Sequence, residues 1–555
     1  MTHINELADR YVAAWAALSP VDATHIGEPG YDDKLDDLSP EGFAARGDLK
    51  RDTLAELAAL TPGSAAETTA TEVMQERLGT ELTLLDAGDT AMEVSVLATP
   101  LHSMRRVFDV MPAQGEAAMA DISARLGAFP RALTQWRHTL LDQAAKGNVS
   151  ARQQIIELAG QCVAWTDPAR DNFFLGLVDR LAVSGTQRAE LIRNATAAAS
   201  ATADFGEFLR TELAPRGRPK QAVGPERYAR ASQYFLGARI DLRETYAWGF
   251  AELAQVEAEM RQVAAEIAGP GATVERAVEV LDADPSRILS GPEAFREWMQ
   301  ALAESTIASL NGTHFDIPPA VRTIEARIAP THEGLIYYTP PNADFSRPGR
   351  MWWAVPESQK TFSTWQQTAV VFHEGVPGHH LQLGQAIHEA DRLNRWQRQL
   401  CFCAGHGEGW ALYAERLMEE LGYLQDPGDR LGMLDVRALR TIRVIIDIGM
   451  HLELEIPRDN PFGFHPGERW TPELGWEFLS GHSRLPTDML RFELKRYLGM
   501  PGQAPAYKVG ERLWLRAREQ ARARSADFDL KRFHTDALNL GSVGLDALLS
   551  TFSRL

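Results

Sequence analysis

The sequence predicts a mainly helical protein that carries one small β-sheet in front of a histidine-rich helix. Three observations support this fold class. Apolar residues recur at three- and four-residue spacing before residue 310, as on the buried face of a helix. Short runs rich in β-branched and aromatic residues lie at 320–356, and helical spacing returns after residue 365. We therefore expect a helical scaffold (1–310), a small sheet (320–356) and a helical C-terminal part (365–555), joined in a single unit (1–555).

The scaffold shows helical periodicity from its first residues. Ile4, Leu7 and Tyr11 fall on one helix face. From about residue 115 to residue 310 the chain is dominated by Ala, Leu, Glu, Arg and Gln, which are strong helix formers. Prolines and glycines such as Gly147 and Pro285 mark the turns. We expect successive helices without a repeat of fixed period.

Three runs predict the strands of the sheet. Residues 322–329 alternate apolar and polar side chains, as a half-buried strand does. Residues 334–339 and 350–355 are rich in β-forming residues, and Pro-Pro at 340–341 and Pro-Gly at 348–349 separate them. We expect about three strands directly before the histidine-rich segment.

The segment 371–382 concentrates side chains that bind metals. Within it lie His373, Glu374, His379 and His380, together with two glycines and a proline. Imidazole and carboxylate groups bind zinc, and a further carboxylate beside them can activate a water molecule. This segment is therefore the candidate functional centre of the chain.

The spacing within this segment departs from the usual helical zinc motif, in which two histidines four residues apart share one helix face. Here Pro377 occupies the fourth position after His373. On a regular helix His379 would lie about 120° away from His373, too far round to share an ion. Because Pro377 would clash with the carbonyl of residue 373, the helix cannot be regular. We expect a bulge of two extra residues around 375–378, which brings His379 beside His373 and turns His380 elsewhere.

Two further segments complete a pattern that is similar to a known family. One is Glu-Gly-Trp-Ala-Leu-Tyr-Ala-Glu at 408–415, and the other is a Pro/Gly-rich loop that leads into Tyr507. With 373–382, they resemble the bacterial family catalogued as domain of unknown function 885, over roughly residues 100–550. That family is grouped with zinc metallopeptidases of the gluzincin type. The resemblance implies a large helical zinc-metallopeptidase-like fold, with the small sheet beside the active-site helix and a deep channel.

The resemblance implies a ligand set for Zn²⁺. His373, His379 and Glu408 would bind the ion, and Glu374 would take a proton from the attacking water and return it to the leaving amine. Glu415, two helical turns after Glu408, would orient a ligand histidine. His406 is a rival ligand, because it precedes Glu408 closely enough to reach the same site.

Two more residues are candidates for stabilising the transition state. By the resemblance, Tyr507 would donate its hydroxyl to the developing oxyanion. The segment Asp447-Ile-Gly-Met-His451 recurs near the active site of the family, so His451 would polarise a substrate carbonyl. Packing within the core is the alternative for both side chains.

Composition limits the partners and the location. The net charge is −18, from 57 basic and 75 acidic residues, which disfavours nucleic acids and anionic membranes because both require basic surfaces. We see no signal peptide and no stretch of about 18 uncharged apolar residues that could span a membrane. Cys162, Cys401 and Cys403 are too few for a disulfide framework, so we expect buried free thiols in a cytoplasmic protein. The oligomeric state stays open, with a homodimer as one option.

The function expected from these features is hydrolysis of short peptides by a zinc-dependent metallopeptidase with a metal-activated water. Two alternatives remain open: a metal-dependent esterase or amidase that acts on a non-peptide substrate, and a non-catalytic helical binding protein with structural histidines. A carboxypeptidase would also need a cationic anchor for the substrate terminus. The arginine stripe at positions 437, 440 and 443, or Arg496, would supply one.

Overall fold

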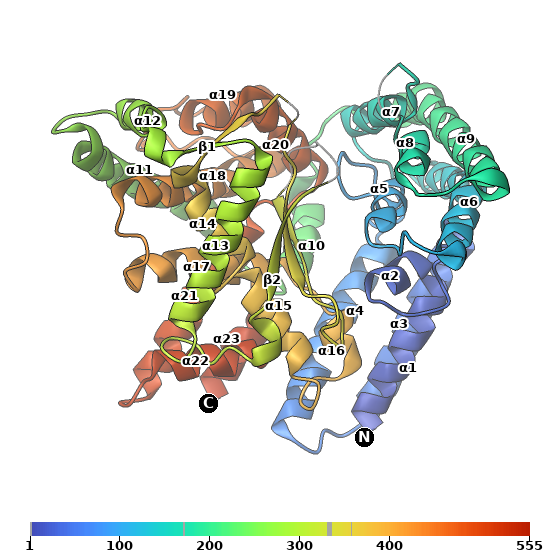
Figure 1. Ribbon diagram of the computed structural model, residues 1–555, viewed down its shortest axis with the longest axis horizontal. Coiled ribbons are helices and arrows are strands. Elements are labelled where there is room, and N and C mark those ends of the chain that lie inside the picture. Colours follow the sequence, from blue (N-terminus) through green and yellow to red (C-terminus); the bar gives the residue numbers. More distant parts are fainter. Residues whose placement is uncertain (1–2, 170–171, 330–335, 357, 555) are drawn as a thin grey trace. The chain divides into compact units, whose positions relative to one another are not determined.

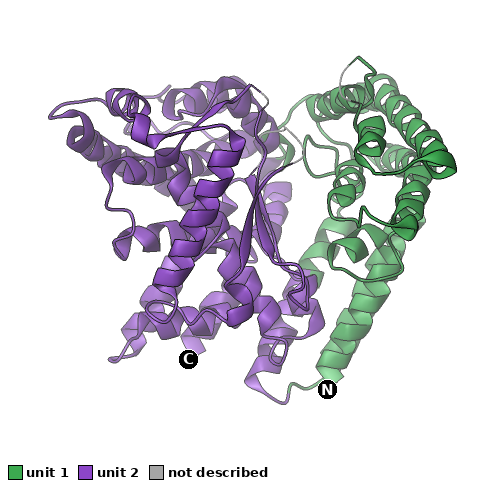
Figure 2. Ribbon diagram, viewed as in Figure 1, with its two compact units in different colours: residues 1–62, 78–223, 498–500 green, residues 63–77, 224–497, 501–555 purple. Residues whose placement is uncertain are grey.

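The protein is mainly helical in the computed structural model, which describes residues 3–169, 172–329, 336–356 and 358–554. Helices make up 67% of the chain and strands 5%, so the predicted class is confirmed (Figure 1). The chain divides into two compact units (Figure 2). Unit 1 consists of residues 1–62, 78–223 and 498–500, and unit 2 of residues 63–77, 224–497 and 501–555. The sequence predicts a single unit (1–555); within unit 1 the N-terminal helices enclose a hydrophobic core of their own.

Unit 1 is a set of antiparallel and crossed helices around an apolar core. Its helices are α1 (His3–Leu18), α2 (Pro20–His25), α3 (Pro40–Ala58), α5 (Pro100–Arg106), α6 (Glu116–Ala145), α7 (Arg152–Thr166), α8 (Phe173–Arg180) and α9 (Gly185–Phe208), and α4 (Ala65–Asp86) extends from unit 2 into unit 1. In α6, Leu126, Phe129, Leu133 and Trp136 are buried at three- and four-residue spacing, so one face of this helix meets α9. All candidate site residues lie outside unit 1.

Unit 2 contains the remaining helices. They are α10 (Gly224–Leu236), α11 (Leu242–Ala268), α12 (Val274–Asp282), α13 (Pro292–Leu310), α14 (Thr364–Glu374), α15 (His379–His388), α16 (Arg395–Gln399), α17 (Ala404–Glu420), α18 (Pro427–Leu452), α19 (Pro472–His482), α20 (Thr487–Gly499), α21 (Ala506–Arg524), α22 (Leu530–Leu538) and α23 (Leu545–Arg554). The central helix is α18, whose residues 437–451 are all buried. It packs against α11, α14, α19 and α21. The side chain of Asp426 caps its first turn, and Glu453 ends it in the left-handed conformation (φ 48°).

The predicted sheet is present as three strands in the order β2-β4-β3. Strand β2 (Ile324–Ile328) runs parallel to β4 (Gly349–Trp353), and β3 (Ile336–Thr339) pairs with β4 in antiparallel register. The first residues of the expected second run, 334–335, lie outside the described part of the chain. A two-stranded sheet of β1 (Ile288–Ser290) and β5 (Thr361–Ser363), which the sequence analysis did not foresee, precedes α14.

The small sheet lies beside α14 and α15. Trp353 of β4 donates its indole N–H to Gln367 Oε1 of α14 over 3.0 Å. The hydroxyl of Tyr338 on β3 lies 2.8 Å from Nδ1 of His380 on α15. The strands are therefore tied to both helices that border the histidine-rich segment.

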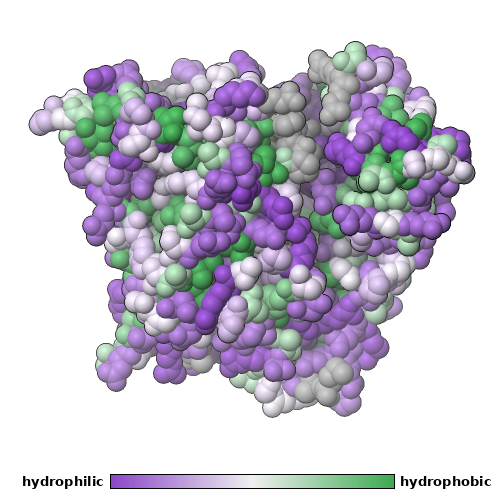
Figure 3. Space-filling model, in the orientation of Figure 1, coloured by the Kyte–Doolittle hydropathy of each residue, from purple (hydrophilic) through white to green (hydrophobic). Residues whose placement is uncertain are grey.

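The cysteines and the surface agree with the composition. All three cysteines are buried and stay outside disulfide bonds, as predicted. Among the described helices, none combines the length and hydropathy needed to cross a membrane. On the face shown in Figure 3, hydrophilic residues predominate and hydrophobic ones appear in small, scattered groups.

Candidate metal centre

The histidine-rich segment is a break between two helices. Helix α14 ends at Glu374 and α15 begins at His379, so residues 375–378 form a turn rather than the bulge that we expected within one helix. The amide of Gly378 donates to the carbonyl of Phe372 over 3.0 Å. A Cβ on Gly378 would lie 1.9 Å from the carbonyl oxygen of His373, so only glycine fits this turn.

Helix α17 fixes the turn from the other side. The indole N–H of Trp410 donates to the carbonyl of Pro377 over 2.8 Å and lies 3.3 Å from that of Gly378. Trp410 is fully buried. Since Trp410 follows Glu408 by two residues, the same helix that supplies the glutamate also holds the turn between the two histidines.

The turn brings His379 beside His373 and places both against Glu408. The Oε2 atom of Glu408 lies 3.4 Å from Nε2 of His373 and 3.4 Å from Nε2 of His379. Two ligand atoms at about 2.0–2.1 Å from a tetrahedral zinc ion would lie about 3.3 Å apart. Glu408 thus lies at this spacing from each histidine, the ligand atoms of all three residues lie within 4.8 Å of one another, and they form the one such group found among the described residues.

Two polar atoms of these three side chains have no hydrogen-bond partner in the described part of the chain. Oε2 of Glu408 and Nδ1 of His379 are buried without a hydrogen-bond partner among the described residues. Burial disfavours the charged forms, yet contacts with Glu408 and Glu415 raise the pKa of His373, and the two histidines hold the pKa of Glu408 well below its usual range. The Glu408 carboxylate therefore stabilises positive charge on the imidazoles beside it.

Glu415 orients the first histidine, as predicted. Its Oε1 lies 2.7 Å from Nδ1 of His373, so the imidazole donates from Nδ1 and keeps Nε2 for the cluster. One guanidinium nitrogen of Arg440, Nη2, lies 3.4 Å from both Glu415 Oε1 and His373 Nδ1. Glu415 is 3% exposed, and the guanidinium balances its buried charge.

Glu374 lies next to the cluster and has a free oxygen. It is 6% exposed, and its Oε2 is buried without a hydrogen-bond partner in the described part of the chain. Burial raises the pKa of Glu374, which the two histidines partly oppose. A carboxylate with a raised pKa and an unused oxygen is suited to accept a proton near neutral pH.

Tyr507 lies close to the cluster, in the first turn of α21. Burial and the nearby Glu408 carboxylate raise the pKa of its hydroxyl, which is therefore protonated and able to donate. The guanidinium groups of Arg443 and Arg440 lie 4.8 Å and 5.9 Å from the centre of its ring.

His451 does not join this group. It is fully buried, and its Nε2 lies 3.0 Å from the carbonyl oxygen of Tyr497. At 1.5 Å per residue it is about 16 Å further along α18 than Arg440, which contacts His373. We therefore remove His451 from the candidate catalytic residues.

The two other histidines have structural contacts. Nδ1 of His380 contacts the Tyr338 hydroxyl, and its Nε2 lies 2.7 Å from the carbonyl oxygen of Val321. Burial lowers the pKa of His380 to about 4. His406 contacts the Gln382 amide and the Trp514 ring, and burial lowers its pKa to about 3. Neither belongs to the ligand cluster.

The contact of Arg440 with Glu415 and His373 is the main feature that sequence reasoning missed. The stripe at 437, 440 and 443 was visible as a periodic pattern, but nothing in the sequence indicated which arginine meets the metal cluster. Trp410 was recognised only as an apolar neighbour of Glu408, and its hydrogen bond to the turn had no sequence signal.

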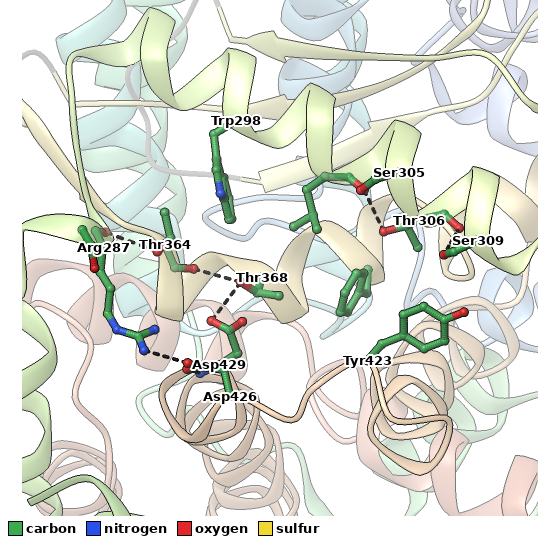
Figure 4. A pocket seen from close by; sticks show the side chains of 13 residues that line it. Arg287, Trp298, Ser305, Thr306, Ser309, Thr364, Thr368, Tyr423, Asp426 and Asp429 are labelled. Carbon is green, nitrogen blue, oxygen red and sulfur yellow. Dashed lines mark hydrogen bonds and ion pairs between the residues drawn. The ribbon is translucent and has the colours of Figure 1, made fainter.

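A separate cavity of about 620 Å³ lies on another face of α14. Figure 4 shows Thr364 and Thr368 of this helix facing Trp298, Asp429 and Tyr423. The hydroxyl of Thr368 contacts Asp429 Oδ1 at 3.1 Å, and burial, with Asp426, raises the pKa of Asp429 to about 6. The lining face of α14 is roughly 140° round the helix from His373, so this cavity is not part of the metal cluster.

Comparisons with known proteins agree with the fold. The model of a family described as bacterial protein of unknown function (DUF885) matches residues 20–551. A crystal structure of a putative lipoprotein from Colwellia psychrerythraea has a TM-score of 0.84 at 22% identity, over 99% of this chain and 98% of that one. A putative lipoprotein of unknown function from Shewanella oneidensis has a TM-score of 0.73 at 16% identity, over 99% of this chain and 100% of that one. A comparison with curated proteins gave no match.

Proposed function

The chain belongs to the bacterial DUF885 family, whose function is unknown, and from its site we propose that it is a zinc-dependent metallopeptidase that hydrolyses short peptides. One observation carries the proposal. Two imidazoles and a carboxylate lie at the mutual spacing of zinc ligands, with a buried carboxylate, Glu374, directly beside them. From the sequence we also expect a likeness to gluzincin peptidases and a deep channel, and we propose both as parts of the same function.

The ligand set favours a catalytic rather than a structural ion. Structural zinc sites use four protein ligands, most often with cysteines, whereas catalytic sites use three and leave one position for water or substrate. His373, His379 and Glu408 are three, and all three cysteines of the chain lie outside the cluster. Bound zinc supplies activation of water and polarisation of the scissile carbonyl.

The chain's own residues then have defined tasks. Glu374 accepts the proton of the attacking water and returns it to the leaving amine. Tyr507 donates a hydrogen bond to the oxyanion, a contribution of roughly 3 kcal/mol for one donor. Glu415 keeps His373 in the tautomer that presents Nε2 to the ion.

The small sheet offers a place for the peptide. The amide side chain of Gln300 covers the outer edge of β2, since it donates to the carbonyl of Ile324 and accepts from the amide of Ala326. On the other side, the last strand is β3, which Tyr338 joins to α15. We propose that an extended substrate pairs with β3 by main-chain hydrogen bonds.

Two alternatives remain, as in the sequence analysis. The same site would serve an esterase or amidase, and a helical binding protein would carry the cluster without turnover. A cytoplasmic location stays a prediction, as do the absence of nucleic acid and membrane partners and the option of a homodimer.

A peptide-library digest tests the proposal. Zinc-loaded protein is incubated with mixed peptides, and the products are read by mass spectrometry, with the Glu374→Gln variant as the blank. We expect cleavage by the wild type and none by the variant at equal zinc content. Equal product from both proteins, or none from either, would contradict peptidase activity.

A further inference from the structure

Three buried arginines lie around Tyr507. Arg440 and Arg443 of α18 face its ring, and Arg496 of α20 contacts the Glu493 carboxylate, which Arg443 also contacts. Each arginine is at least nine-tenths buried. This set, which we call the arginine cluster, adjoins the metal cluster through Arg440.

The arginine cluster has more positive than negative charge. Its three guanidinium groups face two carboxylates, Glu415 beside Arg440 and Glu493 between Arg443 and Arg496. Of the other carboxyl groups nearby, Glu374 and Glu408 would balance a divalent ion, and Asp447, which interacts with Arg496, has its pKa raised to about 7 by burial and so keeps its proton over most of the acid range. One buried positive charge is thus left over, and such a charge is unfavourable without an anionic partner.

The hydrogen-bond donors show the same surplus. Nε and Nη1 of Arg440 are buried without a partner among the described residues. Arg443 donates from Nε to the Tyr497 hydroxyl and from Nη2 to Glu493. By contrast, Arg496 uses Nε and Nη2 for Glu493 and Nη1 for Gln503. The unpaired buried donors of the arginine cluster therefore belong to Arg440, whose guanidinium group lies beside Tyr507.

A purely structural role does not account for this arrangement. Orienting Glu415 requires one N–H of Arg440 and leaves two buried nitrogens unpaired. Guanidinium donors bind carboxylates in a forked geometry, which makes a carboxylate the matching ligand. We infer that the carboxyl terminus of the peptide substrate binds Arg440 and Arg443 beside Tyr507, so that the proposed peptidase is a carboxypeptidase.

The position of Arg440 supports the terminal carboxylate as the anion. A single imidazole, that of His373, separates its Nη2 from the ligand cluster. An extended chain spans about 3.3 Å per residue, so only one or two residues fit between the scissile bond and this anchor. As the C–N bond breaks, one water molecule gives its hydroxyl to the scissile carbonyl carbon and its hydrogen to the amine, which releases a free amino acid or dipeptide; no reactant other than water is needed.

The inference rests on the proposed function, and its first test needs no turnover. Metal-free protein is heated with N-acetylphenylalanine or with its neutral amide, and the unfolding midpoint is recorded. We expect the acid to raise the midpoint of the wild type and the amide to leave it unchanged. Arg443→Gln should lose the response, and Arg443→Lys should keep part of it. A response in Arg443→Gln equal to that of the wild type overturns the inference.

The second test compares substrates on zinc-loaded protein. An N-acyl dipeptide with a free carboxylate should be cleaved at least about thirtyfold faster, in kcat/KM, than its C-terminal amide, because a buried charge would lose its partner. Arg443→Gln should remove that preference. Arg430→Gln, a charge loss at a partly exposed position near the start of the same helix, should keep it.

The outcomes separate the two proposals. Stabilisation by the acid alone, without turnover of any peptide, supports the carboxylate site and contradicts the peptidase. Equal turnover of acid and amide supports the peptidase and overturns this inference. If C-terminal amides are cleaved only when their last residue is glutamate, the arginine cluster binds a side-chain carboxylate and not the chain terminus. That result also overturns the carboxypeptidase assignment. The comparison of acid and amide on the wild type remains decisive where an arginine variant does not fold.

Discussion

At the scale of single residues, the site depends on which imidazole nitrogen faces the cluster. The 2.7 Å contact with Glu415 directs Nδ1 of His373 away from it and leaves Nε2 beside Glu408. The buried carboxylate of Glu415 in turn forms an ion pair with Arg440. Ligand affinity should therefore depend on a residue that does not touch the ion.

This dependence predicts the effect of Glu415→Gln. The amide accepts more weakly from His373 and no longer balances Arg440, so zinc affinity should fall by about 10- to 100-fold. Competition with a chromophoric chelator measures it. Glu419→Gln, on the same helix and 30% exposed in its side chain, serves as the control and should bind zinc as the wild type does. Unchanged affinity in Glu415→Gln would remove the carboxylate from the site.

At the scale of elements, the turn between α14 and α15 makes the cluster possible. The sequence predicted that Pro377 interrupts the helix and that His379 returns to His373, because both follow from local rules for proline and helical spacing. It did not predict that the helix stops fully for residues 375–378. That outcome depends on Trp410, which comes from a distant helix and hydrogen-bonds the turn.

The turn predicts opposite results for two Gly→Ala variants. In Gly378→Ala the new Cβ would collide with the His373 carbonyl at 1.9 Å, so the turn must shift. We expect a lower unfolding midpoint and loss of tight zinc binding. Gly481 lies in α19 with nothing within 4 Å of an added Cβ, so Gly481→Ala should be neutral or stabilise by up to about 1 kcal/mol. Thermal unfolding and zinc titration of both variants check this, and a Gly378→Ala protein that matches the wild type would contradict it.

Contacts between distant segments mark the limit of prediction from sequence. The helices and the three strands follow from periodicity and composition, and the three candidate ligands are named from the motif and the family resemblance. The covered edge of β2 depends on Gln300, and the surplus charge beside Tyr507 depends on Glu493 meeting two arginines. Such pairings arise from the packing of whole helices and strands, which local sequence patterns do not encode. The same packing places His451 against the carbonyl of Tyr497 and not beside the candidate ligands.

At the scale of the whole molecule, burial of ionisable groups links stability to pH. Asp447, in the middle of α18, is fully buried and accepts from the Tyr228 hydroxyl and the Gly502 amide through one oxygen, Oδ2. Burial raises its pKa to about 7, although both hydrogen bonds oppose the shift. Between about pH 4 and pH 7 the folded state therefore keeps a proton that the unfolded state loses, so this group lowers stability as the pH rises through that range.

The variant Asp447→Asn should remove this dependence. Its amide oxygen can accept both hydrogen bonds, and it carries no charge at any pH. From pH 5 to pH 7.5 the stability of the variant relative to the wild type should rise by about 2 kcal/mol. Urea unfolding at both pH values, followed by a probe in unit 2, measures the change. A stability difference that is the same at both pH values would show that Asp447 is charged when folded.

The central claim is that one ion is shared by two imidazoles and a carboxylate from three helices. Anomalous X-ray diffraction at the zinc absorption edge, on crystals grown with zinc, tests it most directly. The account predicts one peak per chain at about 2.0–2.2 Å from Nε2 of His373, Nε2 of His379 and the carboxylate of Glu408. A map without that peak, or with zinc held by other residues, would contradict it.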